Sequence, residues 1–527
     1  MKKILLSACF ALLSFSTNAQ EIPTTVVKSE VFKDEYKFSS IILVEDDGSG
    51  GILIVRSYQG GVFSSGSGYY FEHYDSNMKL IKEYEYEMRQ KKSDKTKTYG
   101  DILGVILDDK NIRLIEYVYD KSNKAFICNA LSSNINDFNF TSQELFRVSS
   151  EEIQRSPIIS FMGIGSGARN YDGDAGANMI VNEDRSAFAI TLDIKDKSAE
   201  THKLFLFDKS LNKKIDHTFK RDIKDKKFRY ENIDVSKDGT TLYILGKVYT
   251  DEKKNKKEGG KYQFELTRIT KDSEKTQVFD TEEHFSSSLK TIIFEDRVTC
   301  IGFYSDRKDS RFKGISYFEL DPQSLAIKKS KFNPFTEQFI IDKYGKEKDK
   351  ELKFLSFKKI LITPTNEIVF NAEEFYITTQ YVSNGMNGGG YTRTIYHYDD
   401  IVSAKINTSG DIAWARNINK RQSTSGDDSY ISYTSTLKGN DTYFFINTGE
   451  KVKKLKNDRI QFGQTSTKKS NLNVIKINPN GDFDYQEILD DKDNDVPFMV
   501  SDGAITGNSV IFIGRKGKKK QLLKVTL

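Results

Sequence analysis

Long apolar runs, net charge and cysteine are all scarce in this 527-residue chain. No segment approaches the 18 or so apolar residues of a membrane-spanning helix, so we predict no transmembrane segment. Without Lys2 and Lys3 the chain has 78 basic and 75 acidic residues, and a net charge of +3 argues against a nucleic-acid binder. Two of the three cysteines, Cys128 and Cys300, lie in separate apolar patterns, which predicts buried free thiols instead of a disulfide.

Tryptophan (1) and proline (7) are also rare, whereas Phe (36) and Tyr (27) are abundant. Abundant aromatic residues exclude a disordered chain and suit strands with one packed and one wet face. A polar turn flanked by short apolar or β-branched runs recurs along the whole chain. Its eight copies span residues 44–56, 107–117, 181–191, 235–246, 294–304, 362–372, 437–447 and 500–514.

This period of strand pairs predicts an all-β fold, most simply a β-propeller. A second turn-centred pair follows most copies, as in residues 402–416 and 473–488, so each repeat would form a four-stranded blade. We predict eight blades, with seven as the alternative, in a single domain over residues 20–527. The last repeat lacks a rim strand, and residues 24–33 are expected to supply it and close the ring.

The amino terminus predicts export from the cytoplasm. Lys2 and Lys3 precede an apolar stretch from Ile4 to Phe15, and Thr17-Asn18-Ala19 forms a small-residue cleavage site. Residues 1–19 are therefore interpreted as a signal peptide. We expect a periplasmic protein, while association with the outer membrane or secretion stays open.

Long insertions gather in the connections between the second and third strands of the blades, and between one blade and the next. In an antiparallel blade these connections share one face, where binding is expected. The insertion at 376–399 is predicted to be a loop that contains Tyr381, Tyr391, Arg393 and Tyr396, residue types that interfaces use. A basic insertion adds further candidate binding residues, namely Lys451, Lys453, Lys454 and Lys456.

No motif indicates catalysis. The run from Gly163 to Ala168 has the glycine spacing of a dinucleotide site but no helix after it. Asp491, Asp493 and Asp495 lack the glycine and glutamate of a calcium loop. The histidines stand apart, with no pair at metal-ligand spacing. We predict no catalytic residue, no metal and no cofactor; the histidines are His73, His202, His217, His284 and His397.

Two segments resemble a known group. ILITPTNEIVFNAEEFYITT (360–379) and YHYDDIVSAKINTSGDIAWARNINKRQ (396–422) are similar to uncharacterised secreted β-propeller-like proteins of Bacteroidetes, and the signal ending in Asn18-Ala19-Gln20 is typical of that phylum. The resemblance implies an envelope protein and supplies no catalytic residues. Proteins of this group often end in a sorting domain, whereas this chain ends in an expected propeller strand, which favours the periplasm.

The sequence therefore predicts a non-catalytic scaffold that binds a protein partner in a cell-envelope assembly. The alternatives are a glycan-active hydrolase or lyase and a glycan-binding propeller. An enzyme would gather Asp or Glu with Arg or Tyr at the mouth of the central channel. A glycan-binding module would display coplanar exposed tyrosines from 376–399.

Overall fold

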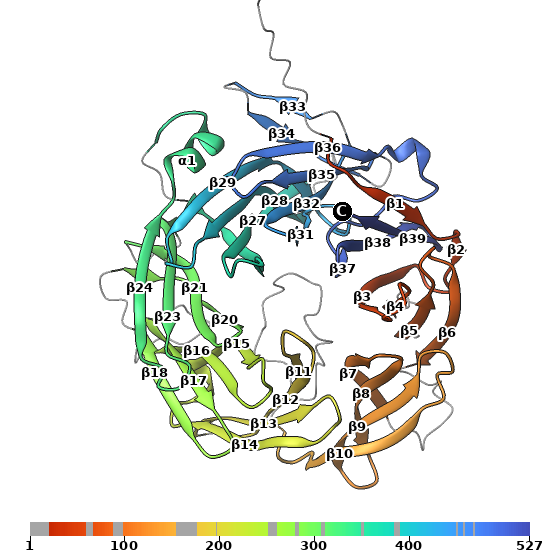
Figure 1. The fold of residues 1–527 in the computed structure, drawn as a ribbon, viewed down its shortest axis with the longest axis vertical. Helices are drawn as coiled ribbons and strands as arrows, with labels where there is room; N and C mark the ends of the chain where they lie inside the picture. Colours follow the sequence, from red (N-terminus) through yellow and green to blue (C-terminus); the bar gives the residue numbers. More distant parts are fainter. Residues whose placement is uncertain are drawn as a thin grey trace, which may run out of the picture.

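The computed structural model describes residues 21–59, 67–87, 99–153, 177–196, 198–250, 261–279, 284–306, 311–348, 352–383, 390–449, 452–456, 459–466 and 469–527. Its antiparallel sheets follow one another around a common centre and form a β-propeller (Figure 1). This confirms the predicted all-β class and propeller architecture. The predicted signal peptide, Gly163–Ala168 and Lys451 lie outside the described residues. No helix in the described part has the length and apolar composition needed to span a bilayer.

Within the described ranges, eight sheets contain at least four strands. The first four sheets in chain order are β3 (Phe38–Asp46), β4 (Ile52–Gln59), β5 (Ser67–Tyr74) and β6 (Leu80–Glu87); β7 (Tyr99–Asp108), β8 (Asn111–Asp120), β9 (Ala125–Asn134) and β10 (Thr141–Ser149); β11 (Ala177–Val181), β12 (Ala187–Asp193), β13 (Glu200–Asp208) and β14 (Lys213–Arg221); and β15 (Phe228–Val235), β16 (Leu242–Tyr249), β17 (Tyr262–Ile269) and β18 (Glu274–Phe279).

The fifth and sixth sheets carry additional short strands. In the fifth, β19 (Phe285–Ser286) and β20 (Lys290–Phe294) both pair with β21 (Arg297–Ser305), which is followed by β23 (Gly314–Leu320) and β24 (Ile327–Pro334). The sixth contains β26 (Leu355–Ile362), β27 (Ile368–Ser383), β28 (Gly390–Ile406), β29 (Ile412–Lys420), β30 (Gln422–Thr424), β33 (Lys453–Lys454) and β34 (Ile460–Phe462). A separate strand pair joins β22 (Arg311–Phe312) to β25 (Leu352–Lys353).

The seventh sheet is formed by β31 (Thr434–Lys438), β32 (Asp441–Thr448), β35 (Asn471–Ile477) and β36 (Phe483–Leu489). The last combines β37 (Ala504–Thr506), β38 (Ser509–Lys516) and β39 (Lys519–Thr526) with β1 (Thr25–Lys28) and β2 (Phe32–Lys33) from the start of the chain. The first strand of a sheet lies towards the centre and the fourth at the rim, as β31 and β36 show in Figure 1.

Each of the eight recurring sequence patterns forms a hairpin on the inner side of one sheet, between its first two strands or, in the fifth sheet, between β20 and β21. The turns contain residues with positive φ, among them Asp109 (55°), Asn366 (60°) and Gly439 (57°). Glycine and asparagine adopt this conformation at low cost, which explains the polar turn residues in the sequence pattern.

The core lies between neighbouring sheets. One buried cluster joins Ile115 of the second sheet to Phe188 of the third, and Phe146 stacks on Phe205 across the same boundary with ring centroids 4.0 Å apart. Apolar side chains on both faces of a sheet therefore pack against its two neighbours. Cys128 and Cys300 are buried and free, as predicted, and burial raises the pKa of the Cys300 thiol to about 12.

The ring closes through the two ends of the described chain. β1 pairs antiparallel with β39, from Thr25 opposite Thr526 to Lys28 opposite Leu523, and β2 continues along the same strand. The prediction that residues 24–33 complete the last sheet is therefore confirmed. A buried ion cluster lies beside this junction, where the Arg56 guanidinium contacts Asp34 at 2.8 Å and also pairs with Glu72.

One α-helix, α1 (Glu337–Tyr344), lies in the connection between the fifth and sixth sheets. In the sequence, Thr336 as a cap followed by the apolar Phe339, Ile340 and Tyr344 predicts a short helix over 336–352. The structure confirms the start of this helix but ends it eight residues after Thr336, at Tyr344. Thr336 caps the amino end by accepting a hydrogen bond from the Phe339 N–H, and Gly345 ends the helix at φ 73°. Two single-turn 3₁₀ helices, η1 (Asp225–Lys227) and η2 (Asp491–Asp493), occur in other connections.

Candidate functional site

One face of the ring carries the additional structure. Strand direction alternates within each sheet, so connections between second and third strands share a face with those between successive sheets. The long hairpin of β27 and β28, the short strands β30, β33 and β34, and helix α1 all belong to these connections. We call this surface the elaborated face.

The segment predicted as a loop over 376–399 is mostly strand. β27 and β28 continue beyond the blade with an unbroken register from Phe375 opposite Tyr398 to Ser383 opposite Gly390. β30 adds a third strand next to Tyr396. The loop prediction is therefore wrong for the described part of this segment. Its Thr, Tyr, Ile and Val residues favour extended backbone, and their cross-strand partners extend the hairpin.

The register divides the predicted binding residues between two sides of this hairpin. Tyr381 lies opposite Thr392, whereas Tyr391 lies opposite Val382. Adjacent positions in a strand point to opposite faces, so Tyr381 and Tyr396 share one side and Tyr391 and Arg393 share the other. Tyr381 is 67% exposed and Tyr391 is 55% exposed. These two tyrosines therefore do not form the coplanar platform that the glycan-binding alternative expects.

The base of the hairpin is held by side-chain contacts. The Tyr376 ring stacks on His397 with centroids 4.4 Å apart, and its hydroxyl donates to Asp399 at 2.9 Å. Burial and this hydrogen bond raise the pKa of Tyr376 to about 12, so its hydroxyl keeps its proton at neutral pH. The Tyr398 hydroxyl donates to Asp428 at 2.7 Å, and Arg393 donates to Ser425. The hairpin is thus fixed to the ring while its far half stays exposed.

The predicted basic residues that the structure describes lie at the rim end of the same sheet. Lys453 and Lys454 form β33, which pairs with β34, and β34 in turn runs parallel to the end of β29. Both lysines and Lys456 are exposed. In the strand order of the sheet, β28, β29 and β34 separate β33 from β27. The structure therefore does not bring the lysines together with Tyr381.

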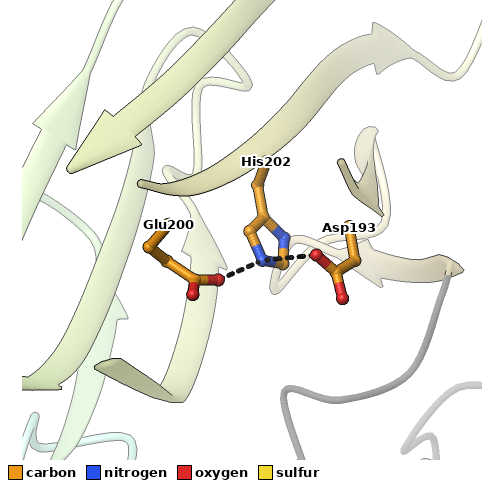
Figure 2. Close-up of side chains that lie close together, drawn as sticks. All are labelled: Asp193, Glu200 and His202. Carbon is orange, nitrogen blue, oxygen red and sulfur yellow. Dashed lines mark hydrogen bonds and ion pairs between the residues drawn. The ribbon is translucent and has the colours of Figure 1, made fainter. Parts of the chain in front are cut away.

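A cluster that the sequence analysis did not identify lies at the ends of β12 and β13. Asp193, Glu200 and His202 are each 4% exposed, and one ligand atom from each lies within 4.8 Å of the others. The His202 Nε2 atom is 3.0 Å from Glu200 Oε1 and 3.7 Å from Asp193 Oδ1 (Figure 2). His202 thus lies beside two carboxylates, an arrangement that the absence of a histidine pair at metal-ligand spacing did not reveal.

The sequence contains a weak signal for this cluster. Glu200 and His202 are two residues apart in a strand, which places them on one face, and Asp193 ends the preceding strand. Only the hairpin register, with Asp193 directly opposite His202, brings the third ligand into place. Spacing rules for histidine pairs do not detect a ligand that comes from the opposite strand.

A small pocket of about 20 Å³ lies against the innermost strands. Lys359 lines it, and burial lowers the pKa of that ammonium group to about 8. Its neighbour Lys358 is 3.3 Å from the buried Glu373 carboxylate. This lining differs from the carboxylate pair that a glycosidase needs. The lining residues are Lys358, Lys359, Tyr433, Thr434, Ser435, Ser501 and Gly503.

No family model and no curated protein matches the sequence. Among solved structures, the chain is similar to the β-propeller domain of the Trilobed protease from Pyrococcus furiosus, with 11% identity, a TM-score of 0.33, and coverage of 72% of this chain and 93% of that one. It is also similar to polysaccharide lyase Uly1, with 10% identity, a TM-score of 0.35, and coverage of 83% of this chain and 93% of that one. A third similar structure is prolyl oligopeptidase B from Galerina marginata, with 10% identity and a TM-score of 0.38. The match covers 90% of this chain and 55% of that protein, so this chain spans about half of its length.

Proposed function

We propose that this protein is a non-catalytic, extracytoplasmic scaffold that binds a protein partner of the cell envelope through the elaborated face. The observation that carries the proposal is an open strand edge on β27. β26 pairs with β27 only as far as Glu374, while β27 continues to Ser383. No strand lies beside this second edge of residues 376–383 within the described ranges.

The backbone groups on this edge have a defined direction. The Phe375 N–H donates to the Phe354 carbonyl at 2.8 Å, towards the β26 side of the sheet. Residues two apart in a strand point their backbone groups the same way, so Ile377, Thr379 and Tyr381 present N–H and C=O groups at the open edge. An extended segment of a partner protein would bond to these groups as an added strand.

The edge lacks the features that usually prevent such pairing. Residues 377–383 contain no proline and no charged side chain, both of which proteins use to protect strand edges. Ile377 is 54% exposed and lies on the same side as Tyr381, so two large side chains would contact the added strand. The partner chemistry that fits is therefore an extended, β-prone protein segment.

The test uses Thr379, whose N–H points outward. Peptides of 12 random residues are selected on the mature protein, and their affinity is measured for wild type, Thr379→Pro and Thr379→Ala. We expect Thr379→Pro to weaken binding about tenfold or more, because proline removes the donor and blocks strand approach. Thr379→Ala keeps the N–H and should bind as wild type does.

Thermal unfolding of both variants checks that the ring is intact, because proline is tolerated where the N–H faces solvent. The same two variants are then compared in crosslinking with envelope extracts, where Thr379→Pro should lose the partners that Thr379→Ala retains. Equal peptide affinity for the two variants would contradict the proposal, as would hydrogen-exchange protection on another face.

We also infer eight blades. The support is that eight sheets each run through successive antiparallel strands from centre to rim, and that each sheet contains one of the eight sequence repeats. A ring of seven would leave one of these sheets without a blade of its own. Top-view class averages from electron cryomicroscopy would count the blades directly.

Export and a periplasmic location belong to the same proposal. The support is the signal-like composition of residues 1–19, with a cleavage site after Ala19. Amino-terminal sequencing of the protein purified from its host should begin at Gln20. Fractionation should recover it with periplasmic markers, and recovery from the cytoplasm with Met1 intact would refute export.

A further inference from the structure

We propose that Asp193, Glu200 and His202 bind a divalent metal ion, with Zn²⁺ as the ion that fits this donor set best. The three side chains come from a single hairpin, β12 and β13, and no other sheet is needed to assemble them. Asp193 lies directly across from His202, and Glu200 precedes His202 by two residues. Cross-strand partners and residues two apart share one face of a sheet, so the backbone itself directs all three to one point.

The distances between the donor atoms suit a small ion. Zinc lies about 2.0–2.2 Å from nitrogen and oxygen ligands, so donors around a tetrahedral ion are about 3.4 Å apart. The separations of 3.0 Å and 3.7 Å from His202 Nε2 to the two carboxylate oxygens lie on either side of this value. All three donor atoms lie within 4.8 Å of one another, so side-chain rotations that bring each pair to this separation would place them at ligand distance.

The site is also held in a fixed geometry. All three residues are 4% exposed, which distinguishes them from solvated surface carboxylates. The His202 ring packs on Tyr230 of the next sheet, with ring centroids 4.1 Å apart. Asp196, in the connection between the two strands, accepts hydrogen bonds from the Ser198 N–H at 2.8 Å and from the Ala199 N–H at 3.2 Å. This turn keeps the connection short and maintains the register of the ligands.

The donor chemistry narrows the choice of ion. One imidazole with two carboxylates suits zinc or a similar first-row divalent ion, whereas calcium and magnesium prefer oxygen donors alone. Three protein ligands leave one tetrahedral position for water or a ligand atom. The hairpin connection beside the cluster lies on the elaborated face.

The mature protein also offers a matched control. His73 is buried to the same extent, 4% exposed, and its Nε2 atom contacts one carboxylate, Asp47, at 2.9 Å. A buried histidine with a single carboxylate satisfies hydrogen bonding without assembling three ligands. If burial and ion pairing alone explained metal uptake, the two histidines would behave alike.

To test the proposal, a chelator first removes bound metal from the full mature chain, and the protein is then titrated with Zn²⁺ by calorimetry. Elemental analysis gives the stoichiometry. We expect one equivalent bound with Kd at or below about 1 µM, which corresponds to the strength of a three-ligand site. His202→Asn and Glu200→Gln should weaken this binding at least 100-fold, while His73→Asn should not change it. Substitution with Co²⁺ should give visible d–d absorption in wild type and His73→Asn only.

Thermal unfolding checks that each variant is folded. If His202→Asn does not fold, Glu200→Gln, which keeps the shape of the side chain, tests the metal site alone. Zn²⁺ should also raise the unfolding temperature of wild type but not of Glu200→Gln. The absence of stoichiometric zinc binding overturns the proposal. Equal affinities in wild type and Glu200→Gln also overturn it, since zinc would then bind elsewhere.

Discussion

Arg56 is 1% exposed and lies between two carboxylates, Asp34 and Glu72. Its guanidinium also stacks on Phe32 and Tyr70, each with the ring centroid 4.9 Å away. Burial alone would lower the pKa of Arg56, but the two carboxylates raise it above its ordinary value, so the charge is kept. The side chain thereby links β4 and β5 to the segment that follows β2.

We predict that Arg56→Met lowers the free energy of unfolding by about 3–5 kcal/mol, because it leaves two carboxylates buried without their cation. Urea denaturation measures this change. The matched control is Arg147→Met, which removes an exposed pair with Glu144 and should cost less than about 1 kcal/mol. Equal effects for the two substitutions would show that burial of the Arg56 cluster is unimportant.

A second residue-scale prediction concerns pH. Burial raises the pKa of the Asp234 carboxyl from its ordinary value of 3.8 to about 7, although Lys290 opposes the shift. Between pH 4 and pH 7 the folded protein therefore holds a proton that the unfolded chain has released. Stability should fall as pH rises through this interval, by at most about 4 kcal/mol. Asp234→Asn should flatten the profile measured by urea denaturation, whereas the exposed control Asp222→Asn should leave it unchanged.

At the scale of elements, an ion pair between Asp342 and Arg416 joins helix α1 to β29. Asp342 is 7% exposed and accepts two hydrogen bonds from Arg416, from Nε at 2.6 Å and from Nη2 at 3.2 Å. The Asn417 N–H donates to the same carboxylate at 3.3 Å. The position of this helix therefore depends on polar contacts in addition to its buried Phe339.

We predict that Asp342→Ala lowers the free energy of unfolding by about 2–4 kcal/mol, since Arg416 loses its buried partner. Hydrogen exchange of the α1 amides should accelerate more than that of β29. Glu337→Ala changes an exposed acidic residue in the first turn and should cost less than about 1 kcal/mol. Unchanged exchange in the α1 of Asp342→Ala would refute this attachment.

At the scale of the whole molecule, the ring closes through a few residues at the start of the described chain. These residues pair with strands at the other end of the sequence. Ser29 illustrates the junction, since its N–H donates to the Leu522 carbonyl at 3.0 Å and its hydroxyl accepts from the Leu522 N–H at 2.9 Å. Pairing β1 with β39 covers a strand edge that would otherwise be open.

Removal of residues 21–29 should therefore lower the unfolding temperature and cause concentration-dependent association through the exposed edge of β39. Calorimetry and size-exclusion chromatography at several concentrations measure the two effects. A synthetic peptide of residues 21–33 should restore both when added in excess, because it replaces the missing strand. A truncated protein that stays monomeric and equally stable would show that closure contributes little.

Local chemistry alone determined the repeated hairpins, the strands beside them and the start of helix α1. Turn residues with positive φ and the alternation of apolar side chains act over a few neighbouring positions, so they are readable in the sequence. Tertiary structure decided which side of a hairpin Tyr381 and Tyr391 occupy, and it brought Asp193 to Glu200 and His202. Those outcomes depend on the register and the length of the paired strands, which are decided by contacts across the strand pair and not by the preference of each residue for extended backbone.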